Sequence, residues 1–537
     1  AAPAIAHMWH MPGHIYSRLK RYHDAVWQQE ASARVDHAHM MRYGLLPDQI
    51  HNFAHNNEWL IRNLIFNGDA ESALSLAKNM IDLPRHPKYN TLKGKGSAHY
   101  GRLRLQQLVN DLELWDEVIR LQDTRYMEPT GKVEEQLKRV RLIARAYLRS
   151  DDLEGAAPLL ADLRERRDGL QAERDEAVDR IERILSAVGK AQDEIESMQK
   201  EERDKYNKQL GPLGETLHEL DGLEHLAHER YAEALESLKK AGAQPPSLMS
   251  LVHLRAGDKD KALELINKPV RGKKNETVPL ANQVYILWEA DEREKAQQAF
   301  ESLRKISATI DFQSPVFSRL TPIAQELGWP EDWRLPVETA RDVGQRPPLD
   351  SLGPFRWEPT KAPEWTLEDH LATSWSLSHF KGRPVLVIFY LGHGCLHCAE
   401  QLHAFSPMAD DFREAGIEII AVSTDPAEQL QKKLAAFTDD DYSFPLVSND
   451  RLDVFKAYRC FDDFERQPLH GTFLIDADGY VRWHDISYEP FMDPKFVLAE
   501  AKRLLSSGPV DPETSDATLG KPGGNESKDD DDSEGDG

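Results

Sequence analysis

Apolar residues recur at three- and four-residue spacing through most of the first 335 residues, and strand-like alternation is almost absent there. In this stretch a small residue recurs at the centre of paired helical segments, each preceded by a short polar turn. The positions that share this pattern are Ala25, Ala73, Ala156, Ala234, Ala262 and Ala296, with a weaker copy around Val118. Small residues let two antiparallel helices approach closely, and stacked pairs bury a continuous core. The pattern predicts an all-α helical solenoid over residues 1–334.

One interval between these helical pairs is much longer than the others. Across it, apolar residues keep three- and four-residue spacing at Val178, Ile181, Leu185, Val188, Ile195 and Met198. This spacing predicts one long amphipathic helix at about 160–210, ending at the Gly-Pro-Leu-Gly sequence of residues 211–214. The helix either projects from the solenoid, as part of a helical hairpin, or forms a dimerising coiled coil.

The pattern changes after residue 334. Residues 335–363 are rich in proline and aperiodic, which indicates a linker. Beyond the linker, short apolar runs alternate with helical segments, a hairpin is expected to turn at Asp478-Gly479, and a last helix precedes residue 507. This alternation predicts one α/β domain over residues 364–507. Residues 508–537 end in GKPGGNESKDDDDSEGDG, which is expected to be a disordered acidic tail or, as an alternative, to bind calcium through its Asp run.

Composition and charge exclude some classes of function. A length of 537 residues indicates several domains, and 40% hydrophobic with 29% charged residues is typical of a soluble protein. No apolar run is long enough to span a membrane. The net charge of −24 argues against a general affinity for nucleic acid. The chain starts with AAPAIAHMWH, so either a leader has been removed or the sequence starts within a longer protein. We expect a soluble protein, and whether it is cytoplasmic or exported stays unknown.

Two of the three cysteines, Cys395 and Cys398, form a C-x-x-C pair directly after an apolar run and at the expected start of a helix. Unpaired backbone N–H groups and the helix dipole favour the thiolate there, and protonated His393 and His397 would add positive charge. Two sulfur atoms at this spacing can also close a disulfide. A metal clip would need a second pair of ligands, and Cys460 is isolated in sequence. The pair is therefore predicted to be a redox dithiol, and no cofactor is expected.

Residues 365–505 resemble a redoxin domain of the alkyl hydroperoxide reductase C/thiol-specific antioxidant group of the thioredoxin superfamily. The landmarks are Lys381-Gly382 before the apolar run, Phe389-Tyr390 within it, the paired cysteines, and FLIDADG at the hairpin. The resemblance implies a thioredoxin fold, catalytic roles for the two cysteines, and an external thiol reductant such as a thioredoxin-like protein.

The sequence departs from the peroxiredoxin pattern at three positions. That pattern places the attacking cysteine at Cys398, but its Pro falls at Leu391, its Thr at Cys395 and its peroxide-polarising Arg near His470. The chain is most similar to a peroxiredoxin-like subgroup in which C-x-x-C replaces Thr-x-x-Cys. Two reactions stay open: Cys398 attacks a peroxide and Cys395 resolves the product, or Cys395 attacks a partner's disulfide and Cys398 resolves the mixed disulfide.

These features lead to two competing functions. The first is a thiol-dependent oxidoreductase with an antioxidant role, whose helical repeats, similar to tetratricopeptide repeats, recruit a protein partner. The alternative is a non-enzymatic repeat adaptor with a degenerate redoxin domain. Cys460 is either a resolving or regulatory thiol or a small buried hydrophobe.

Histidines cluster near the start of the chain. His10 and His14 are four residues apart, as are His51 and His55, so each pair can share one helix face. Together with nearby methionines, the two pairs either bind copper or zinc, or pack and hydrogen-bond between helices.

Overall fold

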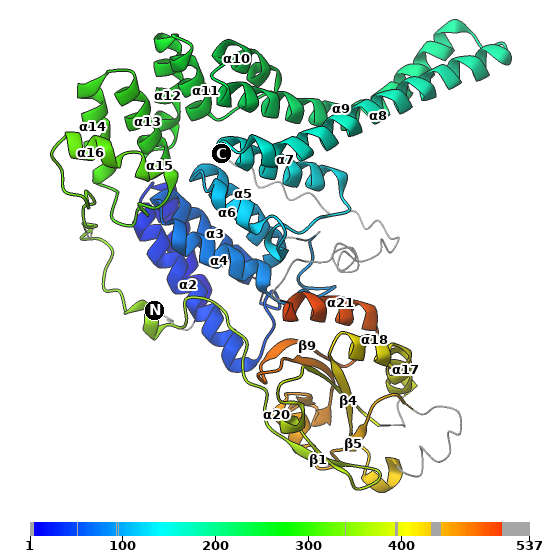
Figure 1. Ribbon diagram of the computed structural model, residues 1–537. Helices are drawn as coiled ribbons and strands as arrows, with labels where there is room; N and C mark the ends of the chain where they lie inside the picture. Colours follow the sequence, from blue (N-terminus) through cyan, green and yellow to red (C-terminus); the bar gives the residue numbers. More distant parts are fainter. Residues whose placement is uncertain are drawn as a thin grey trace.

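The computed structural model describes residues 5–50, 52–92, 94, 96–338, 340–392, 396–430 and 442–506. An all-α region is followed by an α/β domain, as the sequence predicts, and the two lie against each other (Figure 1). Among the described residues, no helix combines the length and the apolar character needed to cross a membrane.

The all-α region is built from antiparallel helix pairs. Its first helices are α1 (Ala6–Arg18), α2 (Tyr22–Tyr43), α3 (Phe53–Asn67), α4 (Ala70–Asp82), α5 (Ser97–Asp111), α6 (Trp115–Leu121), η1 (Arg125–Met127) and α7 (Val133–Arg149). The long α8 (Leu153–Ala187) and α9 (Gln192–Ala227) come next. The last helices are α10 (Tyr231–Lys240), α11 (Pro246–Arg255), α12 (Lys259–Gly272), α13 (Thr277–Glu289), α14 (Arg293–Arg304), α15 (Pro315–Ser318) and α16 (Thr321–Glu326).

The small residues that mark the repeated pattern are completely buried, as closely packed helix pairs require. Relative exposure is 0% for Ala25, Ala73, Val118, Ala156, Ala234, Ala262 and Ala296. In three of the turns within the pairs, a residue with a left-handed backbone is followed by an Asp that caps the next helix. Asp69 and Asp258 accept hydrogen bonds from the backbone N–H groups of Ser72 and Lys261 in this way. The helical region is thus consistent with a series of helical repeats.

The long amphipathic segment is two helices, and the single helix predicted for it is wrong. α8 and α9 form a hairpin that projects from the helical region (Figure 1). Gly189 makes the turn between them with a φ of 73°, a conformation that glycine adopts at little cost. Val178 and Ile195 are buried within the hairpin. The apolar spacing is the same in both helices, so periodicity alone did not reveal the break.

The predicted helix end at residues 211–214 is also wrong, because α9 continues through this sequence to Ala227. Leu213, Leu217 and Leu220 are buried there in one cluster with residues of α7, α8 and α10. Each glycine costs a helix about 1 kcal/mol relative to alanine, whereas burying one leucine stabilises by about 1.5–3 kcal/mol. Tertiary packing therefore outweighs the local preference to stop.

The segment predicted as a linker lies along α2. It carries the short helix η2 (Leu349–Ser351), and Arg346 Nη2 lies 2.8 Å from Asp24 Oδ1. Arg34 Nη1 donates to the carbonyl of Gly353 at 2.8 Å, and His37 Nδ1 lies 3.0 Å from the carbonyl oxygen of Pro354. These contacts lead the chain back along the helical region to the α/β domain.

The α/β domain contains a seven-stranded mixed sheet. Its strands are β1 (Thr366–Asp369), β2 (Ser374–Ser376), β3 (Val385–Tyr390), β4 (Glu418–Ser423), β5 (Leu446–Ser448), β8 (His470–Ile475) and β9 (Val481–Ser487), in the order β2-β1-β5-β4-β3-β8-β9. β6 (Phe461–Asp462) and β7 (Gln467–Pro468) form a separate pair. The helices are η3 (Leu377–Phe380), α17 (Leu396–Phe405), η4 (Ser406–Met408), α18 (Ala409–Glu414), α20 (Asp453–Ala457) and α21 (Pro494–Leu505).

The predicted hairpin and last helix are confirmed as β8, β9 and α21. β3 pairs in parallel with β4 and antiparallel with β8, which makes it an interior strand of the sheet. Every residue of β3 is buried because helices cover both faces of the sheet. Leu386, Ile388 and Tyr390 pack toward α17, α18 and α21, whereas Val387 and Phe389 pack toward α20 and η3. The tail after residue 506 lies outside the described residues.

A buried ion-pair network joins α21 to the helical region. Arg503 Nη2 lies 2.6 Å from Glu500 Oε1 and donates to the carbonyl of Leu83 at 2.9 Å, while the Arg85 backbone N–H donates to Glu500 at 2.7 Å. Arg85, Glu500 and Arg503 are each 1–2% exposed. Removing one member of such a network would leave a buried charge unpaired, at a cost of about 3–5 kcal/mol. The network therefore holds the α/β domain firmly against the end of α4.

Candidate functional site

The candidate site lies where β3 ends and α17 begins. Cys398 is in the first turn of α17 and is 1% exposed. Gly392 follows β3 with a φ of 84°, and a Cβ at this position would lie 2.7 Å from Asp425 Oδ1. Glycine is therefore required both by the backbone conformation and by the space. The first turn of α17, where the helix dipole favours a thiolate, thus lies shortly after the carboxyl end of β3 in the chain.

Cys398 is paired with a histidine from the neighbouring strand. Its Sγ lies 3.2 Å from Nε2 of His470, the first residue of β8, and the backbone N–H of Leu391 donates to the same Sγ at 3.3 Å. β3 and β8 are hydrogen-bonded neighbours with Phe389 opposite Gly471, which fixes His470 beside the end of β3. A base and a hydrogen-bond donor thus converge on one sulfur atom.

The tautomer of His470 follows from its second contact. Nδ1 lies 2.8 Å from the carbonyl oxygen of Tyr488, which can only accept, so Nδ1 carries the proton. Nε2 then presents a lone pair to the Cys398 thiol. Burial lowers the pKa of His470, although the bond to Tyr488 opposes this shift, so the imidazole is neutral at pH 7. His470 can therefore accept the thiol proton, and the resulting thiolate keeps the Leu391 N–H as a donor.

Gln401 holds the two partners in register. It is 0% exposed, and its Nε2 donates to Thr472 Oγ1 at 3.2 Å and to the carbonyl of Phe491 at 3.1 Å. Gln401 lies one helical turn after Cys398, and Thr472 lies on the same face of β8 as His470. The amide therefore ties the helix that carries the thiol to the strand that carries the base.

Of the two cysteines in the predicted dithiol, the structure describes only Cys398. Cys395 and His393 lie outside the described residues, so the pairing of Cys395 with Cys398 stays a prediction. His397 does not join the thiol, because its Nδ1 lies 3.1 Å from Glu400 Oε2 and its side chain is 62% exposed. The sequence pointed to His470 only as the position where an expected Arg is missing. The sequence feature that could have indicated a functional role is the position of His470 at the start of an apolar strand.

Cys460 lies on the other face of the sheet. It is 0% exposed and belongs to the cluster that contains Phe389 and Phe455, whereas Cys398 belongs to the opposite cluster. A Cβ at Gly471 would lie 2.3 Å from Cys460 Sγ, so β8 passes directly over this sulfur atom. Burial, with a smaller effect of Asp485, raises the pKa of the Cys460 thiol. Of the two interpretations of the sequence, the structure supports the buried hydrophobe.

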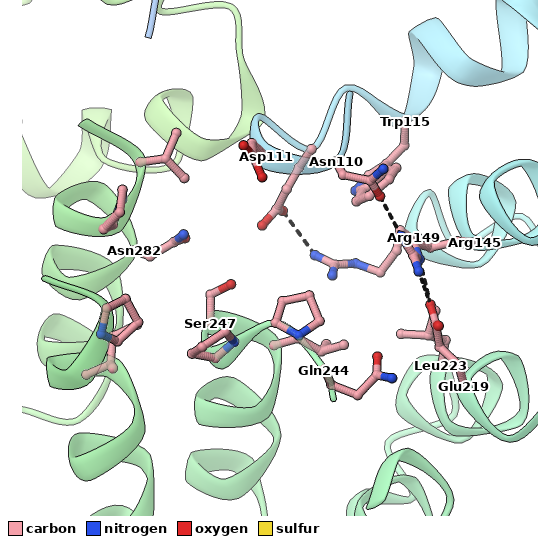
Figure 2. Close-up of a pocket in the computed structure, with 18 of the residues that line it drawn as sticks. Asn110, Asp111, Trp115, Arg145, Arg149, Glu219, Leu223, Gln244, Ser247 and Asn282 are labelled. Atoms are coloured by element: carbon pink, nitrogen blue, oxygen red, sulfur yellow. Dashed lines mark hydrogen bonds and ion pairs between the residues drawn. The ribbon is translucent and has the colours of Figure 1, made fainter. Parts of the chain in front are cut away.

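A second candidate region is a cavity of about 260 Å³ in the helical region. It is lined by residues of α5, α6, α7, α9, α11, α12 and α13 and by the segments that lead into α6 and α11. Arg145 lies between Asn110 and Glu219 at its edge, with Arg145 Nε 2.6 Å from Glu219 Oε1 (Figure 2). Arg149 is paired with Glu113 at 3.0 Å. The cavity is polar on this side and contains apolar residues such as Leu223.

The structure brings together three of the four histidines predicted near the start of the chain. His10 and His14 on α1 meet His55 on α3, and His51 lies outside the described residues. Burial, with smaller contributions from the neighbouring histidines, lowers the pKa of His10 to about 3 and that of His14 to about 4.

Comparison with known proteins finds a family match and relatives for the C-terminal part of the chain. The AhpC/TSA family model matches residues 359–484, which include Cys398 and His470. Chloroplastic peroxiredoxin Q proteins from Oryza sativa subsp. japonica and Sedum lineare are 32% and 30% identical over 150 and 146 residues, which is 27% of this chain in each case. The match spans 65% of the rice protein, just under two thirds of its length, and 75% of the Sedum protein.

Two solved structures were also matched. The peroxidoxin BcpB from Mycobacterium tuberculosis is 23% identical, with 28% of this chain and 97% of that chain covered and a TM-score of 0.25. Peroxiredoxin Q from Xanthomonas campestris is 23% identical, with 26% and 89% covered and a TM-score of 0.23. The matches to relatives and structures thus concern roughly a quarter of the chain.

Proposed function

Because the chain belongs to the AhpC/TSA family through its C-terminal domain, we propose that it is a thiol peroxidase in which Cys398 attacks a peroxide. The single observation that carries this proposal is the contact of Cys398 Sγ with His470 Nε2 at 3.2 Å. The contact supplies a base for the thiol at the position where the peroxiredoxin pattern has its attacking cysteine. The relatives' names as peroxiredoxins support the choice of substrate class.

The reaction starts with transfer of the Cys398 proton to His470. The thiolate attacks one oxygen of the peroxide ROOH, so that an S–O bond forms and the O–O bond breaks. The leaving alkoxide takes the proton from the His470 imidazolium and departs as ROH. Sulfur is oxidised to sulfenic acid, and the peroxide is reduced to an alcohol or, from hydrogen peroxide, to water.

Cys395 completes the cycle as the resolving residue of the C-x-x-C pair. Its sulfur attacks the sulfenic sulfur of Cys398, an S–S bond forms, and the hydroxyl leaves as water after taking the Cys395 proton. An external dithiol, such as a thioredoxin-like protein, then reduces the disulfide and is itself oxidised. No metal or organic cofactor takes part in this scheme.

The burial of Cys398 favours a small substrate. With the residue 1% exposed, a small peroxide fits the site better than the disulfide of a folded protein, which would need much more room around the sulfur. A neutral imidazole lacks the fixed charge of the Arg in the peroxiredoxin pattern. We therefore expect slower turnover than in enzymes that carry that Arg.

The test is peroxide consumption by the full chain with a thioredoxin-type reductant, in the wild type and in C398S, C395S and C460A. We expect C398S to lose turnover completely and C460A to keep it. C395S should still consume one equivalent of peroxide and accumulate a sulfenic acid that dimedone traps at Cys398. Disulfide exchange that starts at Cys395 would be supported instead by two results together. C395S would consume no peroxide, and the wild type would reduce a protein disulfide in a reaction that C398S cannot complete. No peroxide or disulfide turnover by the wild type would support the non-enzymatic adaptor.

For the helical region, we propose that the cavity near Arg145 and Arg149 receives a segment of a protein partner. Its polar lining would bind backbone or side-chain groups, and Gln244 Oε1 is a buried acceptor there without a partner among the described residues. Unsatisfied buried acceptors are costly, and a donor from a bound segment would remove that cost.

This second part of the proposal can be tested with Ser247, which lines the cavity. S247W should fill the cavity and abolish crosslinking of the full chain to a partner, while S302W, on an exposed position of α14, should leave it unchanged. An identical set of crosslinked proteins for both variants would place the partner elsewhere.

A further inference from the structure

Three imidazole rings from two helices converge at the start of the chain. One ligating nitrogen from each of His10, His14 and His55 lies within 4.8 Å of the other two. The ring centroids are 4.2 Å apart for His10 and His14, 4.8 Å for His10 and His55, and 5.5 Å for His14 and His55. His10 is 2% exposed, and the other two are half-buried. The cluster therefore has one rigid member and two members close to solvent.

Gln29 orients the buried member of the cluster. Its Nε2 donates to the backbone carbonyl of His10 at 3.4 Å, which turns Oε1 toward the ring, 2.6 Å from His10 Nδ1. Because an amide oxygen only accepts, Nδ1 carries the proton and Nε2 carries the lone pair. Hydrogen bonding of the second ring nitrogen is the usual way in which proteins orient a metal-binding histidine.

The surroundings of the cluster are built to hold this arrangement. A Cβ at Gly13 would lie 2.4 Å from Gln29 Nε2, so only glycine lets α1 approach α2 closely enough for Gln29 to reach His10. On the other side, the ring of Trp59 meets His14 edge-on at 4.2 Å between centroids. The histidines thus sit between a hydrogen-bonded amide and an aromatic wall.

We propose that His10, His14 and His55 bind one divalent late first-row metal ion, Zn²⁺ or Cu²⁺. Imidazole suits both ions, and a set of three histidines leaves a coordination position for water or a substrate. Zn–N bonds of about 2.0–2.1 Å place the nitrogens of a tetrahedral site about 3.3 Å apart. The half-buried His14 and His55 can turn inward by the small amount needed, while His10 stays fixed by Gln29.

The site would also have a structural effect. A bound ion would add a direct link between α1 and α3 to the ring contacts that these helices already make. Because the folded chain binds the ion and the unfolded chain lacks the assembled site, metal should raise the midpoint of thermal unfolding. This inference does not depend on the proposed peroxidase activity, since none of its ligands belongs to that site.

The test is a titration of the full metal-free chain with Zn²⁺ and, separately, Cu²⁺, carried out in the C398S background so that the reactive thiol does not contribute. The variants are H14Q and H55Q, chosen because these side chains are half-buried, with H7Q as the matched control. His7 lies on the same helix, is exposed and is outside the group of three. Circular dichroism on each variant checks that the helical fold is kept.

We expect one equivalent of metal to bind, and H14Q and H55Q to weaken binding by more than the roughly 10–100-fold that loss of an outer-shell partner costs. Q29L should weaken binding within that range, and H7Q should bind as the parent does. Co²⁺ should give the visible spectrum of a tetrahedral site, and Cu²⁺ should show imidazole nitrogen coupling by electron paramagnetic resonance. Equal affinities for H55Q and H7Q, or no stoichiometric binding of either ion, would overturn the proposal.

Discussion

Cys398 and Cys460 are buried almost equally, at 1% and 0% exposure, and both lie against β8. They face opposite sides of the same sheet. Successive residues of a strand point to opposite faces, so the first residue of β8, His470, meets Cys398 and the second, Gly471, lies over Cys460. The Cys398 thiol thereby gains a base and a backbone donor, whereas the Cys460 thiol is closely packed and, among the described residues, hydrogen-bonds only to a carbonyl oxygen, that of Tyr458 at 3.8 Å.

Burial and reactivity are therefore separate properties of a thiol. Burial by itself disfavours the thiolate, as the raised pKa of Cys460 illustrates. Cys398 is as deeply buried, but its sulfur contacts His470 and the Leu391 N–H, and it lies in the first turn of α17. Four measurements test this difference between the two thiols.

The largest effect should appear when the two thiols compete for an oxidant. On treatment of the full chain with one equivalent of peroxide, we expect Cys398 to be oxidised and Cys460 to stay reduced, since Cys398 contacts an imidazole base whereas Cys460, within the part of the chain that the structure describes, hydrogen-bonds only to a backbone carbonyl. Mass spectrometry after alkylation measures both positions in one sample. Comparable oxidation of the two residues would remove the basis of the proposed activity.

Replacement of the base should have the next largest effect. General bases typically contribute 10²–10⁴-fold, so H470Q should lower the rate of Cys398 oxidation by about 100-fold or more. H397Q is the matched control, because His397 is next to Cys398 in sequence but is exposed and paired with Glu400. Stopped-flow measurement of a single turnover separates this step from reduction by the external thiol. A rate for H470Q close to that of H397Q would assign His470 a packing role only.

The close packing of β8 against Cys460 can be tested by substitution. G471A would place a Cβ 2.3 Å from Cys460 Sγ, and such overpacking typically destabilises by about 1–3 kcal/mol. C460A in the same chain removes the sulfur and should recover part of this loss. A double-mutant cycle measured by chemical denaturation should therefore show a coupling of about 1 kcal/mol. Additive effects would mean that β8 and Cys460 are not in contact.

The smallest effect concerns pH. His470 must be neutral to accept the thiol proton, and burial lowers its pKa below the ordinary 6.5. Activity should therefore be retained down to about pH 6.5 and fall only below it, as the imidazole gains a proton before the thiol can transfer one. In H470Q this acidic limb should be absent. A limb centred above pH 6.5 in the wild type would indicate a different titrating group.

Much of the architecture was predictable because it depends on local pattern. The buried small residues of the helix pairs, such as Ala73 and Ala296, follow from helical spacing, and the hairpin at Asp478-Gly479 follows from turn chemistry. The break at Gly189 was missed, since the apolar stripe continues on both sides of it. The helix through Gly211 and Gly214 was missed because leucines buried in a distant cluster override the local signal.

The residues of the two candidate sites also divide into those that local sequence indicates and those that only the tertiary structure brings together. By itself, the sequence determined that a cysteine stands at a strand-to-helix junction, because strand, turn and helix are encoded within a few consecutive residues. Only the tertiary structure decided that His470, 72 residues away, faces Cys398 and that His55 joins His10 and His14. These contacts depend on the register of β3 with β8 and on the packing of α1 and α3, which are set by long-range burial rather than by any local sequence.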